Sequence, residues 1–238
     1  DEKFSWVIGP TFYNQPGNYG GGVGFLEANL FGENKKFLIY AQYASADSLF
    51  VASYWDPAIA ASRFSWRVFV FGRRENVTEY SYVNPAQYIG QPAPDRGSTL
   101  NQLSAGLLVG MNLWRGLTLD AEIMPSHFSF DGARDLRDPI TPAVLPQDDG
   151  WDVPITFRLI RDKRANWHGV TQGSKFTLAY ERAFPELGSE TRYERAEAGL
   201  VLANKVFEEH NFVVKLGAGY GKNLPFQREF TSGGSNLR

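Results

Sequence analysis

The sequence predicts an all-β fold, an antiparallel β-barrel of about eleven strands whose wall spans a membrane. Three observations support this prediction. Apolar and polar residues alternate with a period of two, the alternating segments are about 8 to 15 residues long, and tight turns alternate with long polar loops along the chain. These features together are typical of transmembrane barrels, whose strands face lipid on one side and the lumen on the other.

The alternation is clearest over residues 117–123, where every odd-numbered residue is apolar and every even-numbered residue is polar. The same period recurs over 153–159, 175–181 and 212–220, and over 64–70 with a less polar second face. Successive side chains of a strand point to opposite faces, so a period of two indicates strands with one apolar face. No segment shows the 3.6-residue period of an amphipathic helix.

We expect eleven strands in chain order. Their predicted ranges are 4–12, 21–31, 35–45, 48–55, 63–73, 100–112, 117–129, 153–162, 173–184, 191–205 and 210–221. These segments exceed the 5 to 6 residues common in globular sheets and match the roughly 9 to 11 tilted residues that cross a bilayer.

The connections between these strands differ in length. Residues 32–34, 112–116 and 207–209 are short, whereas 74–99 and 130–152 are long, polar and rich in Pro, Asp and Gly. Outer-membrane barrels have short turns on the periplasmic side and longer loops outside. We therefore expect 74–99 and 130–152 to lie on the cell surface.

A soluble β-sandwich also alternates apolar and polar residues, so the period alone does not separate the two folds. Aromatic residues near the predicted strand ends favour the membrane barrel, because amphipathic rings suit the level of the lipid headgroups. These residues are Trp6, Tyr13, Tyr43, Trp55, Trp114, Tyr180 and Tyr220.

Composition excludes several other classes. A net charge of -2 without long blocks of like charge gives no electrostatic basis for binding nucleic acid. The absence of Cys excludes disulfides, thiolate zinc sites and cysteine nucleophiles. No run of about 18 apolar residues exists, so we predict no transmembrane helix. Asp1-Glu2-Lys3 is no signal peptide, and we expect any export signal to have been removed.

The sequence offers no motif for catalysis or cofactor binding. His127, His168 and His210 are far apart and have no metal-binding spacing. The acidic pair 148–149 lacks the spacing of a calcium loop, and the glycine-rich segment 20–24 lacks the Lys-Ser/Thr of a phosphate loop. We therefore predict that the protein is not an enzyme and needs no cofactor or metal.

On the barrel interpretation, the polar faces of the strands line the lumen. Both signs of charge occur there, so cross-strand ion pairs are feasible inside a wet channel. The predicted lumen charges are Arg67, Asp120, Glu122, Arg158, Lys175, Glu181, Arg195, Glu197 and Lys215.

Four segments, in the order expected, resemble the bacterial surface antigen superfamily, which includes BamA, TamA and the two-partner secretion transporters. Residues 22–32 resemble its second barrel strand, and Tyr-Trp-Asp-Pro at 54–57 resembles its fourth strand and the following turn. Arg-Asp-Lys-Arg at 161–164 is similar to an Asp-x-Arg element, although the usual Pro is missing. Residues 224–238 resemble the approach to loop six, which normally continues as Leu/Val-Arg-Gly-Phe/Tyr.

This resemblance implies a sixteen-stranded outer-membrane barrel, of which residues 1–238 would be the N-terminal part, ending in loop six. POTRA domains usually precede such barrels and are absent from this chain. In the family, the loop-six Arg folds into the lumen and pairs with acidic groups. Here that residue is Arg238, preceded by Leu237, with Gly233 and Gly234 shaping the loop. An eleven-stranded open sheet would also leave two edges unsatisfied in lipid.

The first predicted strand has features of a poorly closed edge. Pro removes a backbone donor and Gly weakens strand order, and Gly9 and Pro10 lie in the middle of this strand. In BamA-like proteins the first strand forms a lateral seam that client strands can join by β-augmentation. An ordinary first strand with a bend is the alternative. The predicted seam residues are Phe4, Trp6, Ile8, Gly9, Pro10 and Phe12.

The resemblance thus implies an assembly factor of the bacterial outer membrane that folds and inserts β-barrel proteins. Its expected partners are outer-membrane lipid, unfolded outer-membrane protein clients, POTRA domains and accessory lipoproteins. Two alternatives are a protein translocation pore of the two-partner secretion type and a structural or passenger-displaying barrel.

Overall fold

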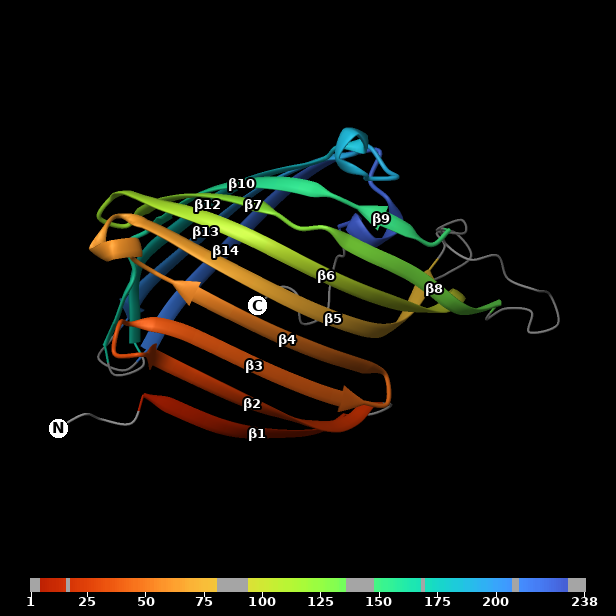
Figure 1. Ribbon diagram of the computed structural model, residues 1–238, viewed down its shortest axis with the longest axis horizontal. Coiled ribbons are helices and arrows are strands. Elements are labelled where there is room, and N and C mark those ends of the chain that lie inside the picture. The colour runs from red at the N-terminus through yellow and green to blue at the C-terminus, as the bar shows by residue number, and fades with distance from the viewer. Residues whose placement is uncertain are drawn as a thin grey trace. The chain divides into compact units, whose positions relative to one another are not determined.

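The computed structural model describes residues 5–15, 18–80, 94–135, 148–167, 170–206 and 210–230 (Figure 1). These residues form antiparallel strands and three short 3-10 helices. The strands are β1 (Trp6–Gln15), β2 (Asn18–Leu30), β3 (Lys35–Ala44), β4 (Asp47–Asp56), β5 (Phe64–Tyr80), β6 (Pro94–Trp114), β7 (Leu117–Ile123), β8 (Ser126–Asp135), β9 (Gly150–Asp152), β10 (Pro154–Asp162), β11 (Ala165–Trp167), β12 (Val170–Ala183), β13 (Glu194–Val206) and β14 (His210–Lys222). The helices are η1 (Ile59–Ala61), η2 (Pro185–Leu187) and η3 (Phe226–Arg228). No helix among the described residues is long and apolar enough to cross a bilayer.

The strands follow chain order, which confirms the predicted antiparallel all-β fold. In the described part of the chain, the strand path is β1-β2-β3-β4-β5-β6-β7-β10-β12-β13-β14, which contains eleven strands. β8 pairs with β6 and β9, and β11 pairs with β12. Short breaks in the chain separate β8 from β7, and β9 and β11 from β10. Each of these three strands therefore belongs to the same span as its neighbour in sequence, and the fourteen labelled strands form eleven spans.

The break between β7 and β8 corrects one predicted strand. Residues 117–129 were expected to form a single strand, but the ladder stops at Ile123 and resumes at Ser126. Pro125 has no N–H to donate, so the ladder loses a donor there, although the Pro125 carbonyl still accepts a hydrogen bond from the Ala105 N–H at 3.1 Å. β8 then pairs with β6 through residues 96–104, beyond the part of β6 that pairs with β7.

The two predicted long loops are shorter than expected. β5 continues to Tyr80 and β6 begins at Pro94, so much of 74–99 is strand. Likewise β8 continues to Asp135 and β9 begins at Gly150. These extensions are rich in polar residues, and composition alone therefore indicated loops. The remaining stretches, 81–93 and 136–147, lie outside the described residues.

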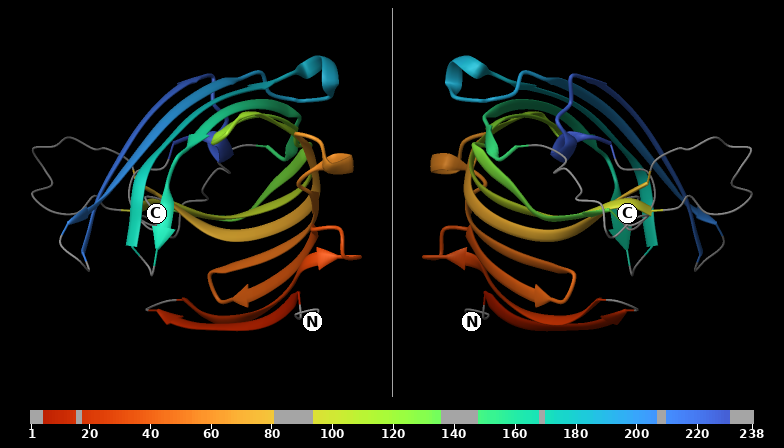
Figure 2. Two further views of the ribbon diagram at one scale, coloured as in Figure 1. Left: turned by 90° about the vertical axis from the view of Figure 1, so that its left-hand side faces the viewer. Right: turned by 90° about the vertical axis from the view of Figure 1, so that its right-hand side faces the viewer.

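The chain divides into two compact units. The first comprises residues 1–55, 68–105 and 125–151, and the second comprises 56–67, 106–124 and 152–238. In the first unit, β1 pairs with β2, and β2 pairs with β3. In the second unit, β10 pairs with β7 on one side and β12 on the other, and β13 joins β12 to β14 (Figure 2).

The second unit has one apolar and one polar sheet face. Leu119 of β7 is 39% exposed and Phe157 of β10 is 52% exposed, whereas Glu122 and Thr156 on the same two strands are 6% and 5% exposed. The exposed side chains are thus apolar and the buried ones polar, the reverse of a water-soluble sheet. This arrangement suits a wall whose apolar face meets lipid.

The first testable prediction concerns the two faces of β7. Leu119→Arg places a charge on the apolar face and should cost about 2 to 4 kcal/mol if that face meets the bilayer midplane. Thr118, on the opposite face, donates a hydrogen bond to Asn112 Oδ1 at 3.0 Å, and Thr118→Arg should be tolerated because it meets a polar environment. Heat-modifiability on gels measures the folded fraction. Equal behaviour of the two variants would contradict the assignment of faces.

Candidate functional site

A row of charged side chains crosses the polar face of the second unit. Antiparallel pairing sets Glu122 opposite Thr156 and Asp120 opposite Arg158, and it sets Thr156 opposite Glu181. The Arg158 guanidinium donates two hydrogen bonds to the Glu122 carboxylate, each 3.0 Å long. Such bidentate pairs are among the stronger and more directional ion pairs in proteins. This pair links β7 to β10 through side chains as well as through the backbone.

Glu181 of β12 continues this row. Its carboxylate accepts one hydrogen bond from Thr156 Oγ1 at 3.1 Å and another from the Tyr193 hydroxyl at 2.9 Å. Tyr193 lies just before β13 and is 1% exposed. Burial, followed by the nearby carboxylates, raises the pKa of Tyr193, so the phenol stays protonated and remains a donor throughout the physiological range.

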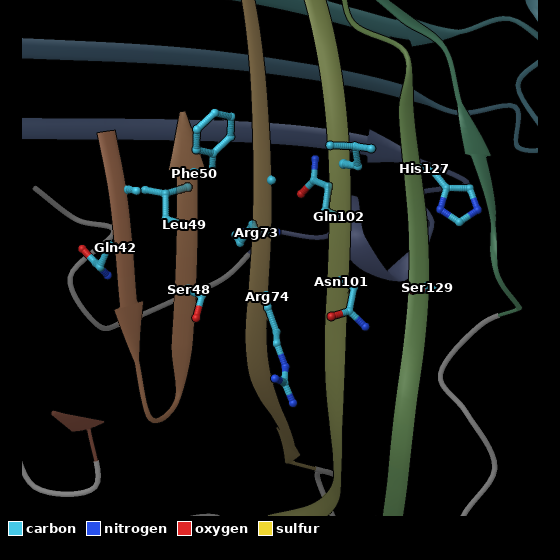
Figure 3. Close-up of a pocket in the computed structure, with 13 residues that line it drawn as sticks. Gln42, Ser48, Leu49, Phe50, Arg73, Arg74, Asn101, Gln102, His127 and Ser129 are labelled. Atoms are coloured by element: carbon cyan, nitrogen blue, oxygen red, sulfur yellow. The ribbon is translucent and has the colours of Figure 1, made fainter. Parts of the chain in front are cut away.

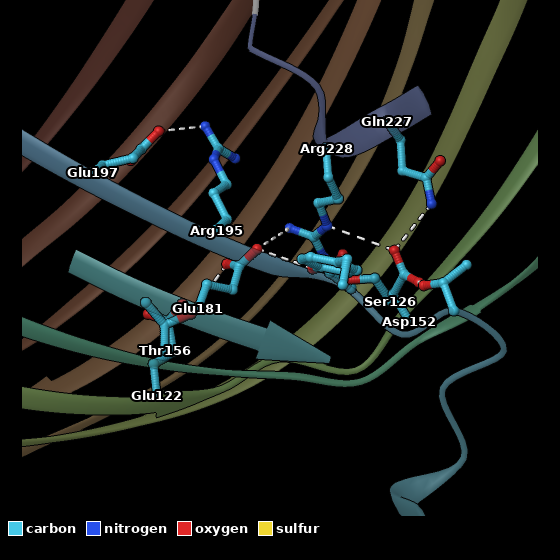
Figure 4. A network of polar contacts seen from close by, with 12 residues as sticks. Glu122, Ser126, Asp152, Thr156, Glu181, Arg195, Glu197, Gln227 and Arg228 are labelled. Atoms are coloured by element: carbon cyan, nitrogen blue, oxygen red, sulfur yellow. Dashed lines mark hydrogen bonds and ion pairs between the residues drawn. The ribbon is translucent and has the colours of Figure 1, made fainter. Parts of the chain in front are cut away.

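The segment after β14 returns to this polar face. We call residues 223–230 the strap; it contains η3 (Figure 4). Arg228 of the strap has its Nε 3.6 Å from Asp152 Oδ2 and its Nη1 4.0 Å from Glu181 Oε1. Gln227 donates to Asp152 Oδ2 at 2.9 Å, and Thr191 donates to Asp152 Oδ1 at 2.5 Å. The strap therefore joins the buried carboxylate of Asp152 on β9 to the part-buried carboxylate of Glu181 on β12.

Apolar contacts hold the strap against β14. A Cβ placed on Gly219 would lie 2.6 Å from Phe230 Cε1, and one on Gly221 would lie 2.2 Å from Leu224 Cδ1. Glycine at these two positions leaves the space that the strap side chains fill. The Arg195 guanidinium also lies over the Phe230 ring, 4.7 Å from its centroid, in a cation–π contact.

The structure brings some of the predicted lumen charges together. Asp120, Glu122 and Arg158 form one group, to which Glu181 connects through Thr156. Arg195 donates to Glu197 at 2.5 Å along β13.

Of the other predicted lumen charges, Lys175 and Lys215 lie apart from that group, whereas the charge of Arg67 acts on Asp120. Lys175 stands opposite Asp162 in the register of β10 and β12. Arg67 lies on β5, half-buried, and Lys215 is an exposed residue of β14.

The predicted loop-six residues cannot be placed. Gly233, Gly234, Leu237 and Arg238 lie outside the described residues. In the strap, the arginine that reaches acidic groups is Arg228, ten positions earlier in the chain. Sequence reasoning did not identify Arg228, Gln227, Asp152 or Tyr193. The available signal was an Arg two positions after the apolar segment Leu-Pro-Phe at 224–226.

The predicted seam residues lie on β1, apart from Phe4, which is outside the described residues. β1 is the first strand of the path, and its described part begins at Trp6. Its apolar residues Trp6, Ile8 and Phe12 are exposed, with Phe12 at 85%. Pro10 does not interrupt the strand, which pairs with β2 through Gln15.

The partner of β1 is rich in glycine. Gly9 faces Gly24, Thr11 faces Gly22, and Phe12 faces Gly21 in the β1–β2 register. Cross-strand side-chain pairs contribute roughly 0.2 to 1 kcal/mol each, and a pair that contains glycine loses this contribution. A side chain at Gly22 would also put its Cβ 2.7 Å from the Ala41 carbonyl oxygen of β3. The close approach of β3 therefore requires glycine at position 22. The same glycine removes a side-chain pair between β1 and β2.

The described residues contain no group of three or more His, Cys, Asp or Glu side chains that could hold a metal ion. The polar face carries carboxylates bound by Arg, Gln, Thr and Tyr donors. This arrangement fixes loops and strands by hydrogen bonds and ion pairs.

Comparison with known proteins identifies the architecture. A family model described as the Omp85 superfamily domain matches residues 29–238. The crystal structure of BamA from Haemophilus ducreyi lacking POTRA domains 1–3 is similar, with a TM-score of 0.70 and 15% sequence identity. That match covers 98% of this chain and 45% of the BamA chain, so this chain spans less than half of that chain's length. No curated protein matches the sequence.

The second prediction tests the strap. Arg228→Met leaves the carboxylates of Asp152 and Glu181 without this guanidinium and should destabilise the folded protein by roughly 2 to 4 kcal/mol, because at least one of the two acids is deeply buried. Urea unfolding followed by tryptophan fluorescence measures the change.

Arg192→Gln is the matched control for Arg228→Met. It removes an arginine from an ion pair with Glu186 in which both side chains are more than half exposed. Exposed pairs contribute little, so its unfolding curve should overlay that of the wild type. An unchanged midpoint for Arg228→Met would show that the strap ion pairs do not hold the fold.

Proposed function

The chain belongs to the Omp85 superfamily, and on this basis we propose that it is the N-terminal part of an outer-membrane barrel that folds and inserts other β-barrel proteins. Its fold is that of a BamA-like barrel. In this proposal, the remaining strands of a sixteen-stranded barrel follow residue 238, and POTRA domains and accessory lipoproteins deliver unfolded clients from the periplasm.

The observation that supports this function best is the position and weakness of the β1–β2 ladder. β1 lies at one end of the strand path, and glycines of β2 stand opposite its central residues. A strand at the end of a path can offer backbone N–H and C=O groups to a new strand. Weak side-chain pairing allows such a strand to move apart from its neighbour at low cost.

In the proposed mechanism, a client strand adds to the free edge of β1 by β-augmentation. Backbone hydrogen bonds supply affinity without reading a particular sequence, which suits a factor that handles many clients. Because each unsatisfied backbone group costs several kcal/mol in lipid, a client strand gains most when it enters the bilayer already paired. The exposed apolar residues Trp6, Ile8 and Phe12 keep the lipid-facing side of the seam apolar.

The strap has a supporting role in this proposal. It binds Asp152 and Glu181 through Arg228 and covers part of the polar face of β12 to β14. We expect it to hold these strands in one arrangement while β1 opens and closes. The proposed loop-six pairing of Arg238 would add a second attachment farther along the chain.

A protein-secreting pore is the second candidate, and the row of Glu122, Arg158 and Glu181 favours it. Charges of both signs on a wet inner face would let an unfolded polypeptide pass without binding tightly. A plug helix and two POTRA domains upstream would support secretion, whereas about five POTRA domains would support assembly.

The third prediction separates these two functions by site-specific crosslinking. The chain has no cysteine, so single cysteines can be introduced without background. Gly9→Cys on β1 is suitable because nothing lies within 4 Å of a Cβ built there. We expect it to form a disulfide with cysteines scanned along the last strand of a client barrel during assembly.

Gly199→Cys on β13 is the matched control, since a Cβ at this glycine also meets nothing within 4 Å. β13 is paired on both sides, with β12 and β14, so it offers no free edge. Crosslinks at Gly9 alone support insertion at the seam. Crosslinks at Gly199 to a secreted polypeptide would support the pore instead, and none at Gly9 in any register would rule out the seam.

A further inference from the structure

A groove lies on the apolar face of the first unit, across β3, β4, β5, β6 and β8 (Figure 3). Its volume is about 420 Å³, within the roughly 300 to 1,000 Å³ typical of small-molecule sites. Gly72 of β5 provides the floor, because it carries no side chain between the exposed Val70 and Arg74 of the same face. Phe50 and Leu103, both exposed apolar residues, form the neighbouring walls.

The groove changes from apolar to polar along the strand direction. Thr99 of β6 donates to Asn76 of β5 at 3.2 Å, which sets the order of the residues that follow on these antiparallel strands. Asn101 then lies beside Arg74, and Leu103 lies beside Gly72. A Cβ on Gly72 would indeed be 3.9 Å from Leu103 Cδ1.

The neighbouring strands extend this change, so that the groove has a polar level at one end and an apolar level at the other. β8 places Ser129 opposite Asn101 and His127 opposite Leu103. The polar level therefore holds Arg74, Asn101 and Ser129, with Ser48 of β4 on the same side of the groove (Figure 3). The apolar level holds Gly72, Leu103 and Phe50, with His127 at its margin. Asp131 lies two residues farther along β8 than Ser129, and its Oδ2 accepts a hydrogen bond from Asn101 Nδ2 at 2.7 Å.

Exposed tyrosines indicate where the polar level of the groove would lie in a bilayer. Tyr43 of β3 is 75% exposed and pairs with Ser48 of β4. Tyr19, near the same end of β2, is 69% exposed. Tyrosine is enriched where the hydrocarbon of a bilayer meets its headgroups. This places Arg74 at headgroup level and the Gly72 floor in the hydrocarbon layer.

We infer that this groove binds one membrane lipid with an anionic phosphate headgroup, its acyl chain lying over Gly72 between Phe50 and Leu103 and its phosphate at Arg74. Charge complementarity selects this occupant, because Arg74 is an exposed cation at the polar end of the groove, next to the apolar residues Leu103 and Phe50. Asn101, Ser129 and Ser48 provide neutral hydrogen-bonding groups beside it. The inference rests on the proposed membrane location of this face and not on the proposed addition of client strands to β1.

The fourth prediction is tested by native mass spectrometry of the full-length protein in detergent. Phosphatidylglycerol is the anionic probe, and phosphatidylcholine with the same acyl chains is the neutral comparison. We expect the wild type to prefer phosphatidylglycerol about fivefold, which corresponds to about 1 kcal/mol for one basic side chain near a lipid surface. Arg74→Gln should abolish this preference.

Two further variants test the apolar part of the groove. Gly72→Leu fills the floor of the groove and should weaken the binding of both lipids. The strand can accept this side chain because the nearest atoms to a Cβ at Gly72 are 3.9 Å away. Val70→Leu adds bulk to the same face of the same strand outside the groove, and Arg115→Gln removes an exposed arginine from the β6–β7 turn. Both controls should bind like the wild type.

Several results would overturn the inference. These are equal binding of the two lipids by the wild type, an unchanged preference in Arg74→Gln, and unchanged binding in Gly72→Leu. Displacement of the lipid by glycerol 3-phosphate as effectively as by phosphatidylglycerol would also overturn it, since the acyl chain would then contribute nothing. Crosslinking at Gly9 is measured separately, so any of these results with the crosslink intact refutes the groove and leaves the proposed seam standing.

Discussion

The backbone hydrogen-bond ladder is the constraint on which the rest of this structure depends. In lipid, each N–H and C=O must be satisfied within the protein, so strands have to pair along their full length. Pairing in turn fixes which side chains share a face: Leu119 and Phe157 on one, Glu122 and Arg158 on the other. The Arg158–Glu122 ion pair and the groove above Gly72 are both consequences of register.

Two regions of the sheet use glycine for opposite purposes. On β14, Gly219 and Gly221 make room for Phe230 and Leu224, and the strap gains apolar contacts there. On β2, glycines opposite β1 remove side-chain contacts and leave the ladder to its backbone bonds. The same residue type therefore strengthens the end of the described chain and weakens its beginning. This asymmetry supports a movable first strand and a fixed last hairpin.

The period of two was sufficient to predict the fold and eleven spans, because it results directly from alternating faces. It could not predict the break at Pro125, the polar extension of β5 to Tyr80 or the two short strands β9 and β11, which depend on pairing with distant partners. The same holds for the site. Glu122 and Arg158 were predicted to lie on one face from their own strands, but Arg228 and Asp152 meet only through folding of the strap.

The strap contact has a consequence for the order of folding. Gln227 and Asp152 are 75 positions apart in sequence, whereas neighbouring strands pair through short turns. Closing such a long loop is entropically costly before the intervening strands are paired, so the hairpins form first and the strap docks last. Interactions absent from the folding transition state act mainly on the unfolding rate. Arg228 therefore contributes to the lifetime of the folded protein more than to the speed with which it forms.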